Sequence, residues 1–201
     1  NPAAAIRAFR LAFGDRPGRR LIVKTRNLAG SAQADDLRAA ADGSAAIRFF
    51  DGTITEAELW ALIKAADAVI SLHRSEGFGL TLAEAMAIGK PTIATAWSAN
   101  LDFMTEENSL LVPCTLVPVK DPGGPYDGLP GRWAEPDTDA AAAMLRQLAE
   151  HPARAREIGE KARTTIARTL TPEAHAAAFF LGGAEATLRG SLSNSAAASN
   201  D

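Results

Sequence analysis

The sequence contains little of what would assign it to several large classes of protein. It has one cysteine, Cys114, which has no partner for an internal disulfide, and no apolar run reaches the roughly 18 residues of a membrane span. Its 21 lysines and arginines are outnumbered by 24 aspartates and glutamates, so the chain lacks the basic excess that neutralises nucleic-acid phosphates. We therefore expect a cytoplasmic protein with no nucleic-acid partner and no transmembrane segment.

The 201 residues, of which 47% are hydrophobic, suffice for one domain with a substantial core. Short apolar runs alternate with amphipathic stretches of helical period, which is typical of a parallel sheet covered by helices. The pattern predicts the α/β class: a doubly wound, Rossmann-like parallel sheet with extra C-terminal helices. The predicted strands are Leu21–Val23, Ile47–Phe50, Ala68–Ser71, Thr92–Thr95 and, as the last strand of the core, Ser109–Val112. The predicted helices are Pro2–Phe13, Gln33–Ala41, Thr55–Ile63, Leu80–Ile88, Asp139–Ala149, Ala153–Thr169 and Pro172–Leu188. Gly14 is expected to end the first helix, Thr55 and Glu58 to form a capping box, and Lys120 to Gly131, rich in Gly and Pro, to form a long loop.

The predicted helix after Gly79 carries a single charge, Glu84, among apolar residues. A helix that is apolar almost all round is expected to be buried. A buried carboxylate needs hydrogen-bond donors, which either the protein backbone or a ligand can supply. Glu84 is therefore a candidate for ligand binding, with a purely structural role as the alternative.

Two glycines, Gly77 and Gly79, lie between a strand end and the start of this helix. The free amides and the dipole of a helix N-terminus favour a phosphate there, and glycine lets backbone approach it closely. Leu82 occupies the third position of the dinucleotide fingerprint and the lysine of a P-loop is absent, so neither of those motifs is present. The pattern predicts an anion site of another kind, and the alternative is a tight turn that needs glycine only for its dihedral angles.

The segment from Ser75 to Pro91, Ser-Glu-Gly-Phe-Gly-Leu-Thr-Leu-Ala-Glu-Ala-Met-Ala-Ile-Gly-Lys-Pro, resembles the Glu-x7-Glu motif of retaining, nucleotide-sugar-dependent glycosyltransferases. These belong to family 4, also called glycosyl transferases group 1, and have the GT-B fold. The resemblance extends over roughly Leu21 to Glu150. It identifies residues 1–190 as the C-terminal, nucleotide-sugar-binding domain of such an enzyme, and we expect residues 191–201 to be a disordered tail.

The resemblance implies roles for individual residues. Glu84 is expected to accept hydrogen bonds from the ribose hydroxyls, and Glu76 to lie near the hydroxyls of the donor sugar as the catalytic candidate. The stretch Arg48 to Gly52 matches the place where relatives hold the nucleobase, largely through backbone. The diphosphate and sugar are expected to contact the backbone amides of Gly77, Phe78, Gly79 and Leu80.

The basic residues that would neutralise the diphosphate are harder to identify in this chain. Members of the family carry an Arg and a Lys ahead of the first helix of this domain, and the chain begins at that helix, so we expect those residues to be missing. The other basic candidates for binding the donor are Arg74, His73, Lys24 and Arg26. The alternative for Arg74 is a solvated loop arginine, and for His73, Lys24 and Arg26 a role without ligand contact is favoured. The segment Trp133 to Asp137 either caps the next helix or edges the cleft, and we interpret it as structural.

The predicted function is therefore transfer of a sugar, with retention, from a nucleoside diphosphate sugar to a glycan or glycoconjugate acceptor. The acceptor would bind through a missing N-terminal domain, and the fragment alone is expected to be inactive. No cofactor and no obligatory metal are expected. Alternatives are a GT-B-like sugar-nucleotide epimerase, a retaining glycosidase and a non-catalytic nucleotide-binding module, and the full-length enzyme could act at the inner face of the membrane.

Overall fold

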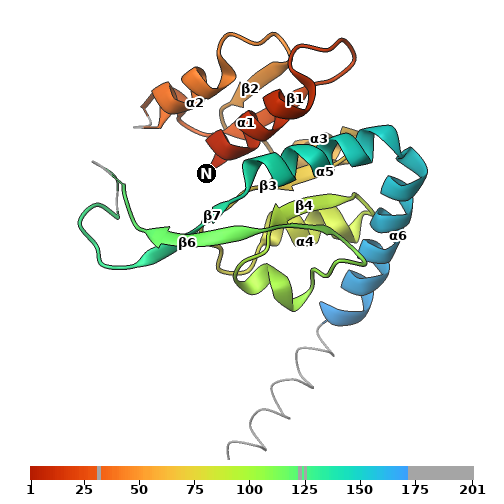
Figure 1. Cartoon of the computed structure of the whole chain (residues 1–201). Coiled ribbons are helices and arrows are strands. Elements are labelled where there is room, and N and C mark those ends of the chain that lie inside the picture. The colour runs from red at the N-terminus through yellow and green to blue at the C-terminus, as the bar shows by residue number, and fades with distance from the viewer. Residues whose placement is uncertain (31–32, 122–123, 125, 172–201) are drawn as a thin grey trace, which may run out of the picture.

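The structure is a computed structural model that describes residues 1–30, 33–121, 124 and 126–171. Helices and parallel strands alternate along the first part of the chain, which confirms the predicted α/β class (Figure 1). The predicted helix Pro172–Leu188 and the tail 191–201 lie outside the described residues. The elements are α1 (Pro2–Phe13), β1 (Leu21–Thr25), α2 (Ala34–Ala41), β2 (Ile47–Asp51), α3 (Glu56–Ala65), β3 (Val69–Ser71), α4 (Leu80–Ala87), β4 (Thr92–Thr95), β5 (Leu110–Val112), β6 (Cys114–Pro118), β7 (Arg132–Pro136), α5 (Thr138–Glu150) and α6 (Pro152–Thr169), with short 3-10 helices at Leu28–Gly30 and Ala99–Asp102.

The parallel strands form two hydrogen-bonded groups. β1 pairs with β2 in the register Leu21 to Ile47, and β4 lies between β3 and β5, with Ile93 opposite both Ile70 and Leu110. Within each group the strands run parallel, so their carboxyl ends lie at one edge of the group, where ligands of such sheets bind.

Local sequence signals explain where several helices begin and end. Pro2 starts α1, and Gly14, at a φ of 57°, ends it. Thr55 and Glu58 form the predicted capping box of α3, in which the Thr55 hydroxyl accepts from the Glu58 amide and the Glu58 carboxylate accepts from the Thr55 amide. These signals act within a few residues, which is why the sequence predicts them well.

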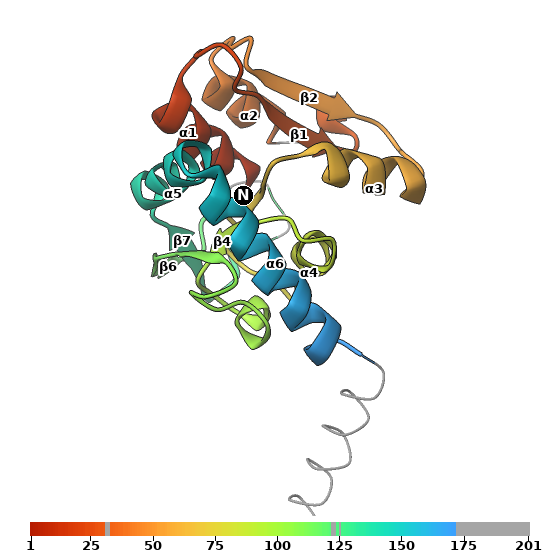
Figure 2. The same cartoon turned by 90° about the vertical axis from the view of Figure 1, so that its right-hand side faces the viewer.

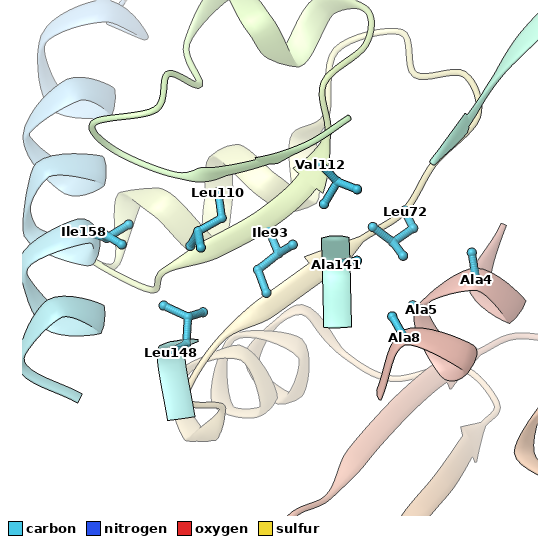
Figure 3. Packing of buried hydrophobic residues seen from close by; sticks show 10 residues of the cluster. All are labelled: Ala4, Ala5, Ala8, Leu72, Ile93, Leu110, Val112, Ala141, Leu148 and Ile158. Carbon is cyan, nitrogen blue, oxygen red and sulfur yellow. The ribbon is translucent and has the colours of Figure 1, made fainter. Parts of the chain in front are cut away.

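The central core lies between the β3–β4–β5 group and helices α1, α5 and α6. Ile93 of β4 is fully buried at its centre, with Leu110 and Val112 of β5 beside it (Figure 3). The small residues Ala4, Ala8 and Ala141 let α1 and α5 approach the strands, which places the first helix of the chain against a much later one.

Helix α6 packs against α4. The two helices lie side by side (Figure 2), and they meet where Gly159 of α6 faces Gly89, just after α4. A Cβ on Gly159 would stand 2.0 Å from the Gly89 carbonyl oxygen, so only glycine fits there. This contact fixes the helix that follows the Gly77–Gly79 loop.

The hairpin of β6 and β7 was not predicted. β6 and β7 are antiparallel, with Thr115 opposite Glu135, and the predicted Gly- and Pro-rich loop from Lys120 to Gly131 connects them. β5 is the last strand of the parallel groups, as predicted, and the hairpin follows it in the chain. The hairpin projects from the domain beside the end of β3 (Figure 1).

Among the helices of the described ranges, none is both long enough and apolar enough to cross a bilayer.

Candidate functional site

The loop between β3 and α4 brings the predicted motif to the carboxyl end of the β3–β4–β5 group. Leu72 anchors its start, since only 2% of its surface is exposed, and Phe78 anchors its end by packing against the buried Phe103, with ring centroids 5.5 Å apart. The loop is thus held at both ends, while Ser75 and Gly77 between them are exposed.

The Glu76 carboxylate already binds two of the predicted amides. Its Oε1 accepts hydrogen bonds from the backbone N–H groups of Gly77 (3.0 Å) and Phe78 (3.4 Å). The Glu76 carbonyl oxygen accepts from the Ser98 hydroxyl at 2.5 Å, which ties the loop to the segment after β4. The amides of Gly77 and Phe78 therefore converge on a single negatively charged oxygen, so they are arranged to hold an anion.

Gly79 is required by its backbone conformation. It precedes α4 with a φ of 92°, in the left-handed region that side chains disfavour. A Cβ there would lie 3.5 Å from Asn100, Leu82 and Phe103, so the position is also closely packed. The turn that opens α4 toward the loop depends on this glycine.

The prediction that α4 is buried on all sides, with Glu84 inside, is wrong. Leu82 and Met86 are buried, but Leu80 is 67% exposed and Ala87 is exposed on the same side as Glu84. Glu84 is half-buried and makes no hydrogen bond or ion pair with any described residue. An eight-residue helix that packs only one face on the core leaves its other face open, and Glu84 lies on that open face.

A cavity of about 550 Å³ adjoins the loop. It is lined by β3 and by residues 76–82, so it includes Glu76 and the four predicted amides of Gly77, Phe78, Gly79 and Leu80. Glu84 and the basic candidates do not line it. The structure therefore brings Glu76 and these amides together and leaves the basic candidates outside that cavity.

His73 lies in the same loop with its ring enclosed, at 7% exposure. Its Nε2 lies 3.1 Å from the Trp97 carbonyl oxygen, which can only accept, so this nitrogen carries a proton. Nδ1 lies 3.2 Å from the Ser71 hydroxyl. Both ring nitrogens thus have protein partners, and the donor-binding role of His73 stays a prediction.

Lys24 and Arg26 lie at the carboxyl end of β1, in the other strand group. The Lys24 ammonium donates to the carbonyl oxygens of Thr25 (2.5 Å) and Gly52, and it lies 5.9 Å from the centre of the Phe50 ring. Arg26 is exposed and makes no hydrogen bond or ion pair with the described residues. Their predicted contact with the donor is likewise untested by this geometry.

The same strand ends carry the stretch expected to hold a nucleobase. Asp51, the last residue of β2, accepts hydrogen bonds from the Leu28 amide (3.1 Å) and the Thr25 hydroxyl (3.0 Å). The hydrogen bond from the Leu28 amide is the main cause that lowers the pKa of Asp51 below its ordinary value. These bonds fix the turn between β1 and the 3-10 helix at Leu28–Gly30.

Arg74 is held by β7, a contact that the sequence analysis missed. Its Nε donates to the Glu135 carboxylate at 2.5 Å, and its guanidinium carbon lies 4.7 Å from the centre of the Trp133 ring. Arg74 and Glu135 are 61 residues apart and share no motif, so one sequence holds no signal for the pair. The predicted cap in this segment is confirmed, because Asp137 Oδ1 accepts from the amides of Asp139 and Ala140 at the start of α5.

The described residues contain no group of three or more His, Cys, Asp or Glu side chains that could hold a metal ion. The expectation of no obligatory metal stays a prediction.

A family model and several solved structures match this chain. A model of the family described as "Glycosyl transferases group 1" matches residues 2–118, more than half of the chain. No curated protein sequence matches the chain.

Solved structures show the same fold over most of the chain. Sucrose-phosphate synthase from Thermosynechococcus elongatus matches with a TM-score of 0.64 and 23% identity, over 95% of this chain and 44% of that one. The C-terminal domain of a group 1 glycosyl transferase, LpcC from Francisella tularensis, matches with a TM-score of 0.64 and 19% identity, over 85% and 80%. Anabaena Alr3699/HepE matches with a TM-score of 0.64 and 16% identity, over 91% and 46%. The chain thus spans less than half of the two longer proteins.

Proposed function

The chain belongs to the glycosyl transferases group 1 family, and from this premise we propose that it is the donor-binding part of a glycosyltransferase. It binds a nucleoside diphosphate sugar at the loop between β3 and α4. Together with a further, acceptor-binding domain it transfers the sugar to a glycan or glycoconjugate.

The proposal is supported by the two hydrogen bonds that the amides of Gly77 and Phe78 donate to the Glu76 carboxylate. Amides of Gly77 and Phe78 that converge on a carboxylate oxygen can instead converge on a phosphate oxygen, which has the same charge and accepts the same bonds. The donor diphosphate would then displace the Glu76 carboxylate. The released carboxylate becomes an acceptor for the hydroxyls of the donor sugar, as the resemblance implies.

Glu84 suits the proposed contact with ribose. It lies on the open face of α4 and has no described partner, so its two oxygens remain available as acceptors. A ribose offers two neighbouring hydroxyl donors, and one carboxylate can accept from both.

In the proposed reaction the acceptor hydroxyl oxygen forms a bond to the anomeric carbon of the sugar. The bond between that carbon and the diphosphate oxygen breaks, the nucleoside diphosphate leaves with the electron pair, and the acceptor proton is transferred to the leaving phosphate. The amides of the loop stabilise the negative charge that develops on the diphosphate. Retention at the anomeric carbon and a hexose as the transferred sugar complete the proposal.

Two structures similar to this chain suggest the first nucleotide to test. The solved structures of Anabaena Alr3699/HepE contain UDP in one case and UDP-glucose in another. Uridine diphosphate is therefore the first candidate, with GDP, ADP and dTDP as comparisons.

A nucleotide titration followed by backbone amide shifts tests the proposal. We expect UDP, or another of the four nucleotides, to shift the signals of Gly77 to Leu80, while a nicotinamide dinucleotide leaves them in place. Glu84→Ala should weaken binding by about 1–3 kcal/mol, because the ribose hydroxyls lose their acceptor. Its stability should stay unchanged, since Glu84 has no described partner.

Glu150→Ala is the matched control, because Glu150 is the exposed last residue of α5 and does not line the cavity beside the loop. It removes the same charge and should leave binding unchanged. Absence of shifts with all four nucleotides would contradict the proposed donor site. Binding by Glu84→Ala that equals that of the unaltered chain would contradict the role of Glu84. The chain alone should transfer no sugar to any acceptor.

A further inference from the structure

We infer that Trp133 and Glu135 of β7 position the Arg74 guanidinium to bind the diphosphate of the donor. The inference rests on the proposed function and deepens it, since it assigns the positive charge of the site to a residue held by the β6–β7 hairpin.

Three contacts fix Arg74 on β7. The Ala134 amide donates to the Arg74 carbonyl oxygen at 2.9 Å, which sets β7 against the loop. Trp133 and Glu135, on either side of Ala134, point to the same face of the strand because side chains alternate. From that face Glu135 accepts from Arg74 Nε, and the Trp133 ring lies beside the guanidinium plane. The backbone of Arg74, its Nε and one face of its guanidinium are therefore all engaged by one strand.

The contacts leave part of the guanidinium available. Nη1 and Nη2 of Arg74 donate to no other described residue, and the side chains of Arg74 and Glu135 are 32% and 31% exposed. A guanidinium edge with two nitrogens is the group that binds phosphate oxygens in a bidentate manner. Arg74 does not line the cavity beside the loop, but it has a fixed orientation and unused donors two residues before Glu76.

The other basic candidates lack this combination. Lys24 donates to backbone carbonyl oxygens, and both ring nitrogens of His73 face protein acceptors or hydroxyls. Arg26 has unused donors, but no described contact holds its side chain. Arg74 alone among these four candidates is both positioned by the protein and able to donate to a ligand.

The positioning strand lies beyond the residues that the family model matches. The match to the family ends at residue 118, the last residue of β6, and β7 begins at Arg132. Trp133 and Glu135 therefore act on a residue of the shared motif loop from an element beyond the matched region.

Positioning and simple electrostatics make opposite predictions for Glu135. If Glu135 acted only through its charge, Glu135→Ala would strengthen nucleotide binding, because it removes a negative charge near the diphosphate. If Glu135 orients Arg74, the same change weakens binding. Glu135→Gln keeps an oxygen acceptor for Nε and should restore the orientation.

The experiment measures dissociation constants of UDP and of uridine, or of the nucleoside diphosphate and nucleoside that the unaltered chain binds, by amide-shift titration. We expect Glu135→Ala, Trp133→Leu and Arg74→Lys each to weaken diphosphate binding about tenfold, since a charge-assisted hydrogen bond is lost or misplaced. Glu135→Gln and Trp133→Phe should bind within about twofold of the unaltered chain. Uridine binding should be the same in all of them.

The Arg74 Nε–H signal gives a second readout in the same samples. It should be a sharp, slowly exchanging resonance in the unaltered chain and in Glu135→Gln, and it should be lost in Glu135→Ala. Arg74→Lys keeps the charge and both partners, so it tests the inference even if the Glu135 or Trp133 variants unfold.

Unchanged or tighter diphosphate binding by Glu135→Ala and Trp133→Leu would overturn the inference while leaving the donor site intact. Equal losses of diphosphate and uridine binding would overturn it as well, because they would indicate a general structural role. If the unaltered chain bound none of the four nucleoside diphosphates, the proposed function itself would fail, and this inference with it.

Discussion

The carboxyl ends of the two strand groups carry similar charged residues and use them differently. After β1 and β2, Lys24 donates to the carbonyl oxygens of Thr25 and Gly52, and Asp51 accepts from the Leu28 amide. After β3, Glu76 binds two amides that a phosphate could also bind, and Arg74 retains unused donors.

The difference shows how one topology separates structure from binding. Both places lie where ligands of parallel α/β sheets bind. In the β1–β2 group the charged side chains form hydrogen bonds with the protein's own backbone, and these bonds fix a turn. In the β3–α4 loop the partners of the charges can be exchanged for a ligand, because Glu76 and Arg74 remain partly accessible.

The largest effect on stability is expected from a side chain placed in the contact between α6 and the end of α4. Gly159→Ala places a Cβ 2.0 Å from the Gly89 carbonyl oxygen, so α6 must move away from α4. We expect a loss of about 3 kcal/mol in the free energy of unfolding, measured by urea denaturation. The loss runs against helix propensity, which favours Ala over Gly in a helix interior by about 1 kcal/mol.

Thr164→Ala serves as its control, because Thr164 is an exposed residue of the same helix. Its stability should change by no more than about 0.5 kcal/mol. Equal stability of the two variants would mean that the α4–α6 contact tolerates a side chain.

A smaller effect separates the two glycines of the loop. Gly79→Ala forces a side chain into a φ of 92° and should lower stability by about 1–2 kcal/mol. Gly77→Ala meets nothing within 4 Å, so its stability should be unchanged. The added methyl group would instead occupy space beside an amide proposed to bind phosphate. Thermal unfolding and UDP titration of both variants test this, and a stable Gly77→Ala that binds normally would argue against close approach of the ligand there.

Lys24 provides a sharper test of the contrast between the strand groups. Lys24→Met keeps the length of the side chain but removes the donor to the Thr25 and Gly52 carbonyl oxygens. We expect it to lower stability by about 1 kcal/mol and to leave UDP binding unchanged. Arg26→Met, at an exposed residue with no described partner, should change neither quantity. Weaker UDP binding by Lys24→Met would instead favour Lys24 as a donor-binding residue.

The sequence alone predicts the parts of this molecule that depend on local signals. The capping box of Thr55 and Glu58, the stop of α1 at Gly14 and the strand–loop–helix unit around Gly79 each lie within a few residues, and the structure has them as expected. The motif from Glu76 to Glu84 is equally local, which is why the family could be identified from it.

The parts that were missed depend on what lies far apart in the chain. Whether Glu84 is buried depends on which elements cover the second face of α4, and the apolar residues of that helix do not encode this. The β6–β7 hairpin joins Thr115 to Glu135 across a long loop, and each strand is five residues with a terminal proline, so neither has a clear alternating pattern. The pairing of Arg74 with Glu135 follows from that hairpin and could not be predicted without it.

The smallest expected effect concerns Asp51 and appears only in acid. The hydrogen bond from the Leu28 amide holds the pKa of Asp51 below its ordinary value of 3.8. A carboxylate with a lowered pKa in the folded state stabilises that state above its ordinary pKa, and this contribution is lost as the pH falls through the lowered value. Asp51→Asn removes the titrating group, so the melting temperature of the variant should fall less steeply than that of the unaltered chain as the pH drops below 3.8. Thermal unfolding across that range measures the difference, with Asp67→Asn, at an exposed residue without a described hydrogen bond, as the control. Identical slopes for Asp51→Asn and the unaltered chain would mean that the Leu28 contact does not persist in solution, and the β1–β2 strand ends would then be less firmly closed than the contrast with the β3–α4 loop requires.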